Sequence, residues 1–428
     1  MTSSRERTEL ALARIADPTG EGARSCLTVY ADAARAAADA ADARARSGRP
    51  LGPLDGAVVT IKDLFDVAGE VTRAGSAVLA KRGSPAVADA PTIARLREAG
   101  AVIVAKTNMT EFAFSGVGAN PHFGTPGNPA DRKRIPGGSS SGGAVACADG
   151  IGEITIGTDT GGSTRIPAAL CGIVGYKPTA KRITREGAYP LSFALDSIGP
   201  MARSVADCYR ADAGLAAERP EPLQAADLGS IRIGLVQGLV LENMDRIVAP
   251  AFERALGKLG NAKRVDVTLD LSMMVGVNER GGIAPPEAYA IHRTLLSEAG
   301  DGVDPFVRAR IMRAAPMSAA DYIQNMRDRE AGISRMQAAF NDLDVLALPT
   351  TPIVAPTMDE VATPDGFAAR NALLLRNTSI ANFFDLCAIS LPLKLGNSLP
   401  CGLMLFARHG NDRKLFQVAA AVEKALAA

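Results

Sequence analysis

The length and composition of this chain are those of a large globular protein. Hydrophobic residues make up 47% of its 428 residues and charged residues 22%, a composition that excludes the disordered and membrane-spanning classes of protein. The 47 basic and 46 acidic residues leave a net charge of +1, which excludes a strong overall field for nucleic acid or an anionic membrane.

The N-terminal residues favour a cytoplasmic protein. The first ten residues, MTSSRERTEL, hold four charges where a signal peptide has an apolar run. No later stretch approaches the ~20 apolar residues of a membrane span. We therefore expect a cytoplasmic location and no membrane partner.

The first part of the chain alternates helical and strand patterns. Residues 1–50 are rich in Ala and Arg with helical periodicity, and the apolar run 58–61 predicts a short buried strand. Pro91 opens a helical segment that ends at Gly100, and residues 101–106 follow as an apolar strand. A strand, a helix and a strand in this order predict a parallel α/β sheet.

Later apolar runs predict further buried strands, a hairpin and a final helix. Residues 205–345 are richer in helical pattern and poorer in glycine, so we expect them to form a helical cover on the sheet. The remaining predicted elements are strands at 154–157, 231–236 and 345–348, a hairpin of 388–395 with 402–406, and a helix over 412–426.

Cysteine and histidine are spaced in a way that predicts neither disulfides nor a metal site. The six cysteines lie far apart without a CxxC pair, and none of the three histidines lies within five residues of another. We therefore expect free thiols and no metal ion. The scarcity of histidine matters because histidine is the usual catalytic base.

Glycine is concentrated in one segment of the chain. Residues 137–175 contain eleven glycines in 39 positions, interleaved with serine and threonine. Glycine lets backbone N–H groups approach a ligand closely, and small hydroxyl residues supply nucleophiles or hydrogen bonds. The segment lacks the GxxxxGK[ST] and GxGxxG patterns of nucleotide-binding loops, so no cofactor is expected.

One part of this segment fits the sequence pattern of the α/β-hydrolases. Residues 138–142 match GxSxG, the nucleophile elbow of α/β-hydrolase esterases, with His292 or His409 as conceivable bases. The elbow follows a strand, whereas the basic run 132–134 precedes these residues. An esterase of this type is kept as an alternative.

A serine nucleophile without histidine needs another base, and a desolvated lysine can serve because burial lowers its pKa. Lys62 ends the predicted strand 58–61, and Lys106 ends the strand 101–106 in the same way. From periodicity alone, either lysine is a strand-end residue that reaches toward solvent. The pattern does not choose between them.

Long motifs of the chain resemble those of the amidase signature family. Residues 137–179, GGSSSGGAVACADGIGEITIGTDTGGSTRIPAALCGIVGYKPT, are similar almost throughout to the defining stretch of that family. Residues 52–76, GPLDGAVVTIKDLFDVAGEVTRAGS, resemble its lysine-bearing strand. The resemblance implies one large α/β domain over residues 1–428, with a central mixed, mostly parallel β-sheet covered by helices on both faces.

The same resemblance implies a catalytic triad. It places the nucleophile at Ser163, a relay serine in a cis peptide at Ser139 and the base at Lys62, with a pKa lowered but still above neutral. Lys106 is then structural. The run of three serines leaves Ser140 open as the alternative relay.

Substrate-binding residues also follow from the resemblance. The backbone N–H groups of Thr160, Gly161 and Gly162, together with that of the nucleophile, would face the developing oxyanion. Arg165 either binds a substrate carboxylate or forms a structural ion pair with Asp159, and we favour the ion pair because buried charges are normally paired. Whether the run 132–134 touches substrate is left open.

The activity implied by the resemblance is amide hydrolysis. The chain would cleave the C–N bond of a small amide or carbamoyl-type substrate to a carboxylate and ammonia or an amine, through a serine acyl-enzyme. Residues 376–390 resemble the matching stretch of members that cleave allophanate and related compounds. The alternative is the glutaminase (A) subunit of a tRNA-dependent amidotransferase. We expect no nucleic-acid partner, and a homodimer is left open.

Overall fold

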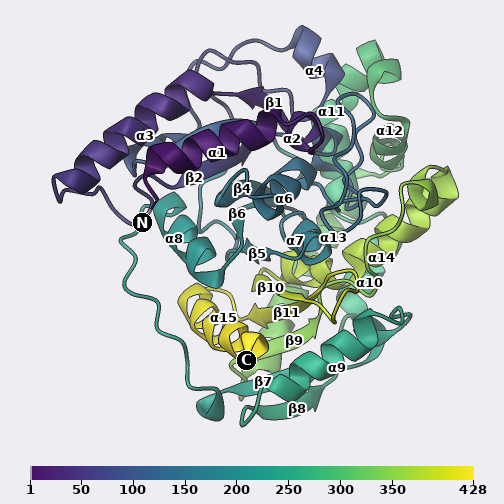
Figure 1. The fold of residues 1–428 in the computed structure, drawn as a ribbon. Helices are drawn as coiled ribbons and strands as arrows, with labels where there is room; N and C mark the ends of the chain where they lie inside the picture. Colours follow the sequence, from purple (N-terminus) through teal and green to yellow (C-terminus); the bar gives the residue numbers. More distant parts are fainter. Residues whose placement is uncertain (1) are drawn as a thin grey trace.

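An eleven-stranded mixed β-sheet runs through residues 2–428, which are the residues that the computed structural model describes (Figure 1). The strand order across the sheet is β1-β3-β2-β4-β6-β5-β10-β11-β9-β7-β8. The strands are β1 (Cys26–Val29), β2 (Val58–Lys62), β3 (Val102–Thr107), β4 (Ile154–Asp159), β5 (Val174–Lys177), β6 (Ser197–Ala202), β7 (Arg232–Val236), β8 (Lys263–Val267), β9 (Val345–Pro349), β10 (Cys387–Leu393) and β11 (Cys401–Ala407).

Helices alternate with these strands along the chain. Their bounds are α1 (Ser4–Ala16), α2 (Gly22–Ser25), α3 (Ala31–Arg46), α4 (Ala77–Arg82), α5 (Pro91–Glu98), α6 (Ser141–Ala148), α7 (Arg165–Cys171), α8 (Val205–Leu215), α9 (Val248–Lys258), α10 (Ser272–Glu279), α11 (Ala284–Ala299), α12 (Pro305–Met312), α13 (Ala319–Met336), α14 (Pro364–Phe383) and α15 (Asp412–Ala427).

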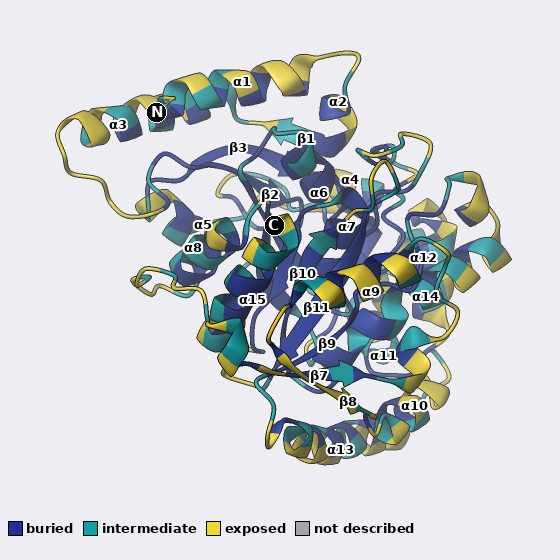
Figure 2. Cartoon of the chain, turned by 60° about the horizontal axis from the view of Figure 1, so that its bottom comes forward, coloured by how far each residue is buried: buried dark blue, intermediate teal, exposed yellow. Residues whose placement is uncertain are grey.

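Helices cover both faces of the sheet, as expected. On β2, Val58 packs in one cluster with α1 and α3, whereas Val59 and Ile61 pack in another with α5. This follows from the alternation of side chains along a strand, which sends neighbouring residues to opposite faces. In Figure 2 the central strands are mostly dark blue, the edge strand β8 is largely yellow, and helices such as α1 and α3 carry exposed residues on their outer sides.

The sheet is mixed, but the expectation that it is mostly parallel is wrong. Four of the ten neighbouring pairs are parallel and six are antiparallel. The pattern of strand, helix and strand correctly predicted the parallel pair β2 and β3, which α5 connects. The centre of the sheet is built instead from β6, β5, β10 and β11, and the last two form the predicted hairpin. Short hairpin connections allow only antiparallel pairing.

The sequence did not predict β1, which interrupts the segment 1–50 expected to be helical, nor β5, β6 and β8. β8, KRVDV, is an edge strand whose first four residues are exposed. β6, SIGPMA, contains a glycine and a proline, which are depleted in strands. β7 and β8 also show that residues 205–345 extend the sheet as well as cover it.

The six cysteines are all buried and free, as expected. Among residues 2–428 we find no helix with both the length and the apolar character needed to cross a membrane.

Candidate active site

Two parallel strands end side by side at the candidate site. β2 ends at Lys62 and its parallel neighbour β4 ends at Asp159, so the segments that follow them meet at one edge of the sheet. After β4 the chain turns through residues 160–164 into α7, and α6 begins at Ser141 within the serine run. The lysine-bearing strand, the serine run and the glycine-rich turn therefore lie together.

Lys62 is fully buried at this edge. Its Nζ donates hydrogen bonds to Ser139 Oγ at 2.8 Å and to Thr158 Oγ1 at 2.9 Å. Burial lowers the pKa of Lys62 to about 7, against the opposing effect of the charges of Asp196 and Asp159. The lowering of the pKa agrees with the expectation, and its cause is the complete enclosure of the side chain.

Ser139 and Ser140 have different surroundings. The Gly138–Ser139 peptide is cis, as the resemblance implied, and Ser139 carries the hydroxyl that contacts Lys62. The Ser140 hydroxyl donates instead to the Thr158 carbonyl at 3.5 Å. Of the two candidate relay serines, only Ser139 contacts the lysine within the described part of the chain.

Ser163 lies in the turn between β4 and α7 and is 4% exposed. Its carbonyl accepts a hydrogen bond from the Ser140 backbone N–H at 3.3 Å, which joins the turn to the serine run. Gly162 has a φ of 134°, and a Cβ there would overlap the Thr378 hydroxyl. Only glycine fits this position, which explains one of the two glycines before Ser163.

Side chains of α14 hold two carbonyl groups at and before the turn. Thr378 Oγ1 donates to the Gly161 carbonyl at 2.6 Å, and Asn382 Nδ2 donates to the Asp159 carbonyl at 3.1 Å. The C=O and N–H of a trans peptide point in opposite directions, so the N–H of Gly162 points away from Thr378. No hydrogen bond in residues 2–428 uses the N–H groups of positions 161 to 163. They are available to an oxyanion.

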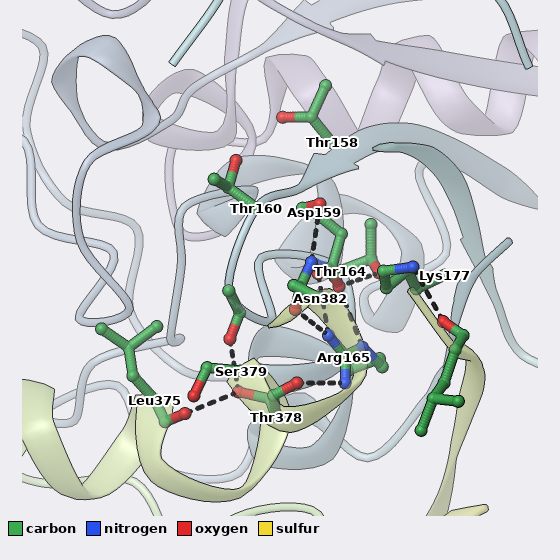
Figure 3. A network of polar contacts seen from close by, with 12 residues as sticks. Thr158, Asp159, Thr160, Thr164, Arg165, Lys177, Leu375, Thr378, Ser379 and Asn382 are labelled. Atoms are coloured by element: carbon green, nitrogen blue, oxygen red, sulfur yellow. Dashed lines mark hydrogen bonds and ion pairs between the residues drawn. The ribbon is translucent and has the colours of Figure 1, made fainter. Parts of the chain in front are cut away.

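Arg165 forms the structural ion pair that we favoured. Figure 3 shows its buried guanidinium against Asp159, with Nη2 at 2.9 Å from Oδ1 and Nε at 3.0 Å from Oδ2. Its Nη atoms also donate to Asn382 Oδ1 and to the Thr378 carbonyl. Burial alone would raise the pKa of Asp159, but Arg165 holds it well below its usual range. Every nitrogen of Arg165 is engaged, so none is free for substrate.

The basic run 132–134 also lies outside the cavity. Arg132 pairs with Asp149 at 2.9 Å, and Arg134 pairs with Asp131 at 3.1 Å. Lys106, the rival of Lys62, is buried with its Nζ 3.2 Å from Glu70. These side chains have structural contacts, and none lines the cavity beside Ser163.

A cavity of about 390 Å³ opens onto the turn. Thr160, Gly161 and Ser163 form one wall, and the other walls are mainly apolar, with Leu191 and Phe383 among the lining residues. The predicted nucleophile and two of the three predicted substrate-binding residues therefore line one space. Its volume suits a small molecule.

Arg310, on α12, also lines this cavity and was missed by the sequence analysis. Its guanidinium stacks over the Phe114 ring, 4.6 Å from the centroid, and only its Nε has a hydrogen-bond partner in the described chain, the Phe114 carbonyl at 3.1 Å. Burial lowers the pKa of Arg310 to about 10, and neighbouring Arg313 adds to the effect. Neither arginine forms an ion pair with a carboxylate of residues 2–428. The sequence offers one signal for such an arginine. No acidic residue lies four positions before or after Arg310 to pair with it along the helix.

The histidines do not take part in this site. His292 is buried against the Phe112 ring at 4.0 Å, and neither ring nitrogen has a hydrogen-bond partner within the described residues. His409 is exposed, with Nδ1 3.1 Å from the Asp385 carbonyl. Residues 128–140 contain no strand, so the GxSxG pattern lacks the context of a nucleophile elbow. Among residues 2–428 no three His, Cys, Asp or Glu side chains are grouped to hold a metal ion.

Comparisons with known proteins extend these observations over the whole chain. The family model described as Amidase matches residues 6–416. A 2-amino-5-chloromuconic acid deaminase of Comamonas testosteroni is 35% identical over 91% of this chain and 86% of its own length. The A subunit of the glutamyl-tRNA(Gln) amidotransferase of Anaeromyxobacter dehalogenans is 36% identical over 99% and 93% of the two chains.

Solved structures agree with the sequence comparisons. A crystal structure described as that of an amidase superposes with a TM-score of 0.89 at 34% identity, covering 99% of this chain and 96% of that chain. The chain therefore belongs to the amidase signature family and is a hydrolase that acts on amide C–N bonds.

Proposed function

We propose that Ser163 is the nucleophile of a serine acyl-enzyme mechanism in which Ser139 relays protons and Lys62 is the base. The observation that carries this proposal is the 2.8 Å contact between Lys62 Nζ and Ser139 Oγ, made by a lysine whose burial favours the neutral amine. The turn that holds Ser163 supplies N–H groups without protein partners.

The proton path that we propose uses the contact between Lys62 and Ser139 as its second step. As the Ser163 oxygen attacks the amide carbonyl, its proton passes to the Ser139 oxygen while the Ser139 proton passes to neutral Lys62. The N–H groups of residues 161–163 stabilise the oxyanion. The proton then returns through Ser139 to the leaving nitrogen, and water releases the carboxylate by the same path in reverse.

The substrate that we propose is a small amide or carbamoyl-type compound that carries a carboxylate. Arg310 supports this class because it lines the cavity of Ser163, is protonated at neutral pH and has two guanidinium nitrogens without partners in the described chain. An arginine binds a carboxylate through paired N–H donors. The relative from Comamonas testosteroni is named for a compound of this kind, 2-amino-5-chloromuconic acid.

Ammonia release from matched amides tests the substrate class. We expect succinamic acid to be cleaved with a kcat/KM about ten- to a hundredfold above that of its neutral methyl ester, the value of one charge-assisted contact. Arg310→Met should remove this preference. Arg308→Met is the control, because Arg308 pairs with Asp301 at the surface. Equal cleavage of the acid and the ester by the unchanged protein would contradict the proposed class.

We also propose that the chain works without a nucleic-acid partner. Its net charge of +1 supports this, whereas the 36% identity to the A subunit of an amidotransferase supports the alternative. The purified chain should release ammonia from small amides by itself and should not shift tRNA in a gel at about 0.15 M salt. Ammonia release from glutamine only after partner subunits and tRNA are added would favour the alternative.

A further inference from the structure

Asp196 lies next to the candidate site and is not part of the proposed triad. It precedes β6, the antiparallel neighbour of β4, in which Ser197 pairs with Asp159. Its Oδ1 accepts a hydrogen bond from Thr160 Oγ1 at 2.5 Å. Its Oδ2 accepts from the backbone N–H groups of Leu191 and Ser192, at 2.9 and 3.0 Å. Both oxygens act only as acceptors, which is the bonding pattern of a carboxylate.

The contact with Thr160 fixes the first residue of the catalytic turn. Thr160 lines the same cavity as Ser163 and is followed by the N–H donors at positions 161 to 163. The turn is held from two sides, because Thr378 and Asn382 hold its carbonyl groups and Asp196 holds its side chain. Figure 3 shows that Thr160 lies on the side of Asp159 away from Arg165.

Asp196 also acts on Lys62 through its charge. Burial lowers the pKa of Lys62, and Asp196 is the stronger of the two carboxylates that oppose this, the other being Asp159. Asp159 is neutralised by its ion pair with Arg165, whereas Asp196 has no ion pair within the described chain. Removing Asp196 therefore removes an attraction that favours protonated Lys62.

The charged groups next to Lys62 and on β3 have ion-pair partners of their own. Next to Lys62, Asp63 pairs with Arg73 at 2.8 Å, and on β3 Lys106 pairs with Glu70. Burial raises the pKa of Asp196 above its ordinary value, and its hydrogen bonds and the charge of Arg185 offset part of this increase. Arg185 Nη1 donates to backbone carbonyls, among them those of Phe193 at 2.8 Å and Asp196 at 3.3 Å.

A second cavity of about 200 Å³ lies behind this contact. Asp196, Thr158 and Arg185 are among its lining residues. Thr158 is also the second hydrogen-bond partner of Lys62, so one residue that lines this cavity contacts the lysine directly. Because water can reach Asp196 there, its charge is partly screened, and we expect a moderate effect on Lys62.

We infer that Asp196 is a positioning residue that orients the turn of residues 160–163 through Thr160. Its negative charge also favours the protonated form of Lys62. The inference rests on the proposed roles of Lys62 and Ser163. It adds a carboxylate that touches neither the substrate nor the reacting atoms and acts through two residues that do. No metal ion, cofactor or further subunit is needed for this role.

The test is the pH dependence of Asp196→Asn, which keeps the size of the side chain and removes its charge. We expect kcat to fall about ten- to a hundredfold with little change in KM, because the turn is misplaced. We also expect the acidic limb of kcat/KM to move to lower pH by about half a unit or more, because Lys62 loses an opposing charge. An unchanged limb would overturn the inference.

Two variants separate the effects. Thr160→Val keeps the carboxylate and removes the hydroxyl, so kcat should fall without a shift of the acidic limb. Asp212→Asn removes another buried carboxylate, which pairs with Arg182, and should leave the limb in place even if it lowers the melting temperature. A limb that moves equally in Asp212→Asn would show a general effect of stability and would overturn the inference.

A second readout needs no substrate and separates the inference from the proposed function. In protein labelled with ¹³C at lysine Cε, the Lys62 resonance can be assigned by its loss in Lys62→Met. It should titrate at lower pH in Asp196→Asn than in the unchanged protein. If the enzyme cleaves no amide but this shift is found, the proposed function fails and the electrostatic link stands. If amides are cleaved and the resonance does not move, the inference fails alone.

Discussion

Lys62 is the residue whose environment departs most from that of an ordinary lysine. A strand-end lysine usually extends to water, but Lys62 is enclosed and reaches two hydroxyl groups. The sequence left Lys62 and Lys106 open as alternatives, and only the resemblance chose between them. The two environments differ, because Lys106 has the Glu70 carboxylate at 3.2 Å, whereas Lys62 forms no ion pair with residues 2–428.

We predict that Lys62→Arg fails almost as badly as Lys62→Ala. A guanidinium stays protonated and cannot accept a proton, so both variants should lose about 10²- to 10⁴-fold in kcat/KM. Lys106→Arg is the control, because arginine can keep the ion pair with Glu70, and it should stay within a few-fold of the unchanged enzyme. Steady-state ammonia release measures all three. Near-normal activity of Lys62→Arg would mean that only positive charge is required.

The pH profile is a separate consequence of the same burial. The proposed mechanism requires the neutral amine, and burial lowers the pKa of Lys62 to about 7, so activity should be low at pH 5.5 and rise through pH 7 toward alkaline pH. An acidic limb should therefore appear in kcat/KM between about pH 6 and 8. A profile that is flat across this range would exclude a titrating lysine base.

At the scale of elements, the sequence predicted best the strands with continuous apolar runs. β2, β3, β4, β7 and β9 lie at or within two residues of their expected positions. All of them except β7 are buried along their whole length, which requires mostly apolar side chains on both faces. Four strands were missed. β8 and β6 leave no apolar pattern, since one is an exposed edge and the other contains glycine and proline, and β1 and β5 are only four residues long. The glycine-rich turn was recognised because glycine has few substitutes where backbone and side chains approach closely.

The turn itself yields a prediction for Gly162→Ala. The φ of 134° and the overlap of a Cβ with Thr378 require the turn to move, which would displace the N–H donors of residues 161–163. We expect kcat to fall about 10²-fold or more, as for the loss of oxyanion donors, while circular dichroism stays unchanged. Gly257→Ala in α9 is the control, because a Cβ there meets no atom within 4 Å. Equal activities of the two variants would contradict the role of the turn.

At the scale of the whole molecule, the site depends on segments far apart in the chain. The turn after β4 is held by Thr378 and Asn382 of α14, and its cavity is completed by Arg310 of α12. Local patterns could identify the serine run and the lysine strand. They could not identify these partners, because nothing in a single sequence states which distant helix packs against the turn.

The ion pair between Asp159 and Arg165 also contributes to the stability of the folded protein. Asp159→Asn leaves Arg165 buried without its carboxylate, so the free energy of unfolding at pH 7 should fall by about 3–5 kcal/mol. The folded pKa of Asp159 lies below its unfolded value, so the stabilisation is complete well above ~3.9 and is lost as pH falls below it. Urea unfolding at pH 7 and pH 3 should show the difference between the two proteins shrinking. The control is Asp32→Asn, because Asp32 is exposed. If the unchanged protein and Asp159→Asn differ equally in free energy of unfolding at both pH values, this account is contradicted.

The central claim is that Ser163 attacks the amide with Ser139 and Lys62 as its proton path. The most direct measurement is mass spectrometry of the peptide labelled by a fluorophosphonate, combined with ammonia release by Ser163→Ala and Ser140→Ala. We expect the label on Ser163, no amide hydrolysis by Ser163→Ala, and a folded protein by circular dichroism. A label on Ser140, with activity surviving in Ser163→Ala, would contradict the claim.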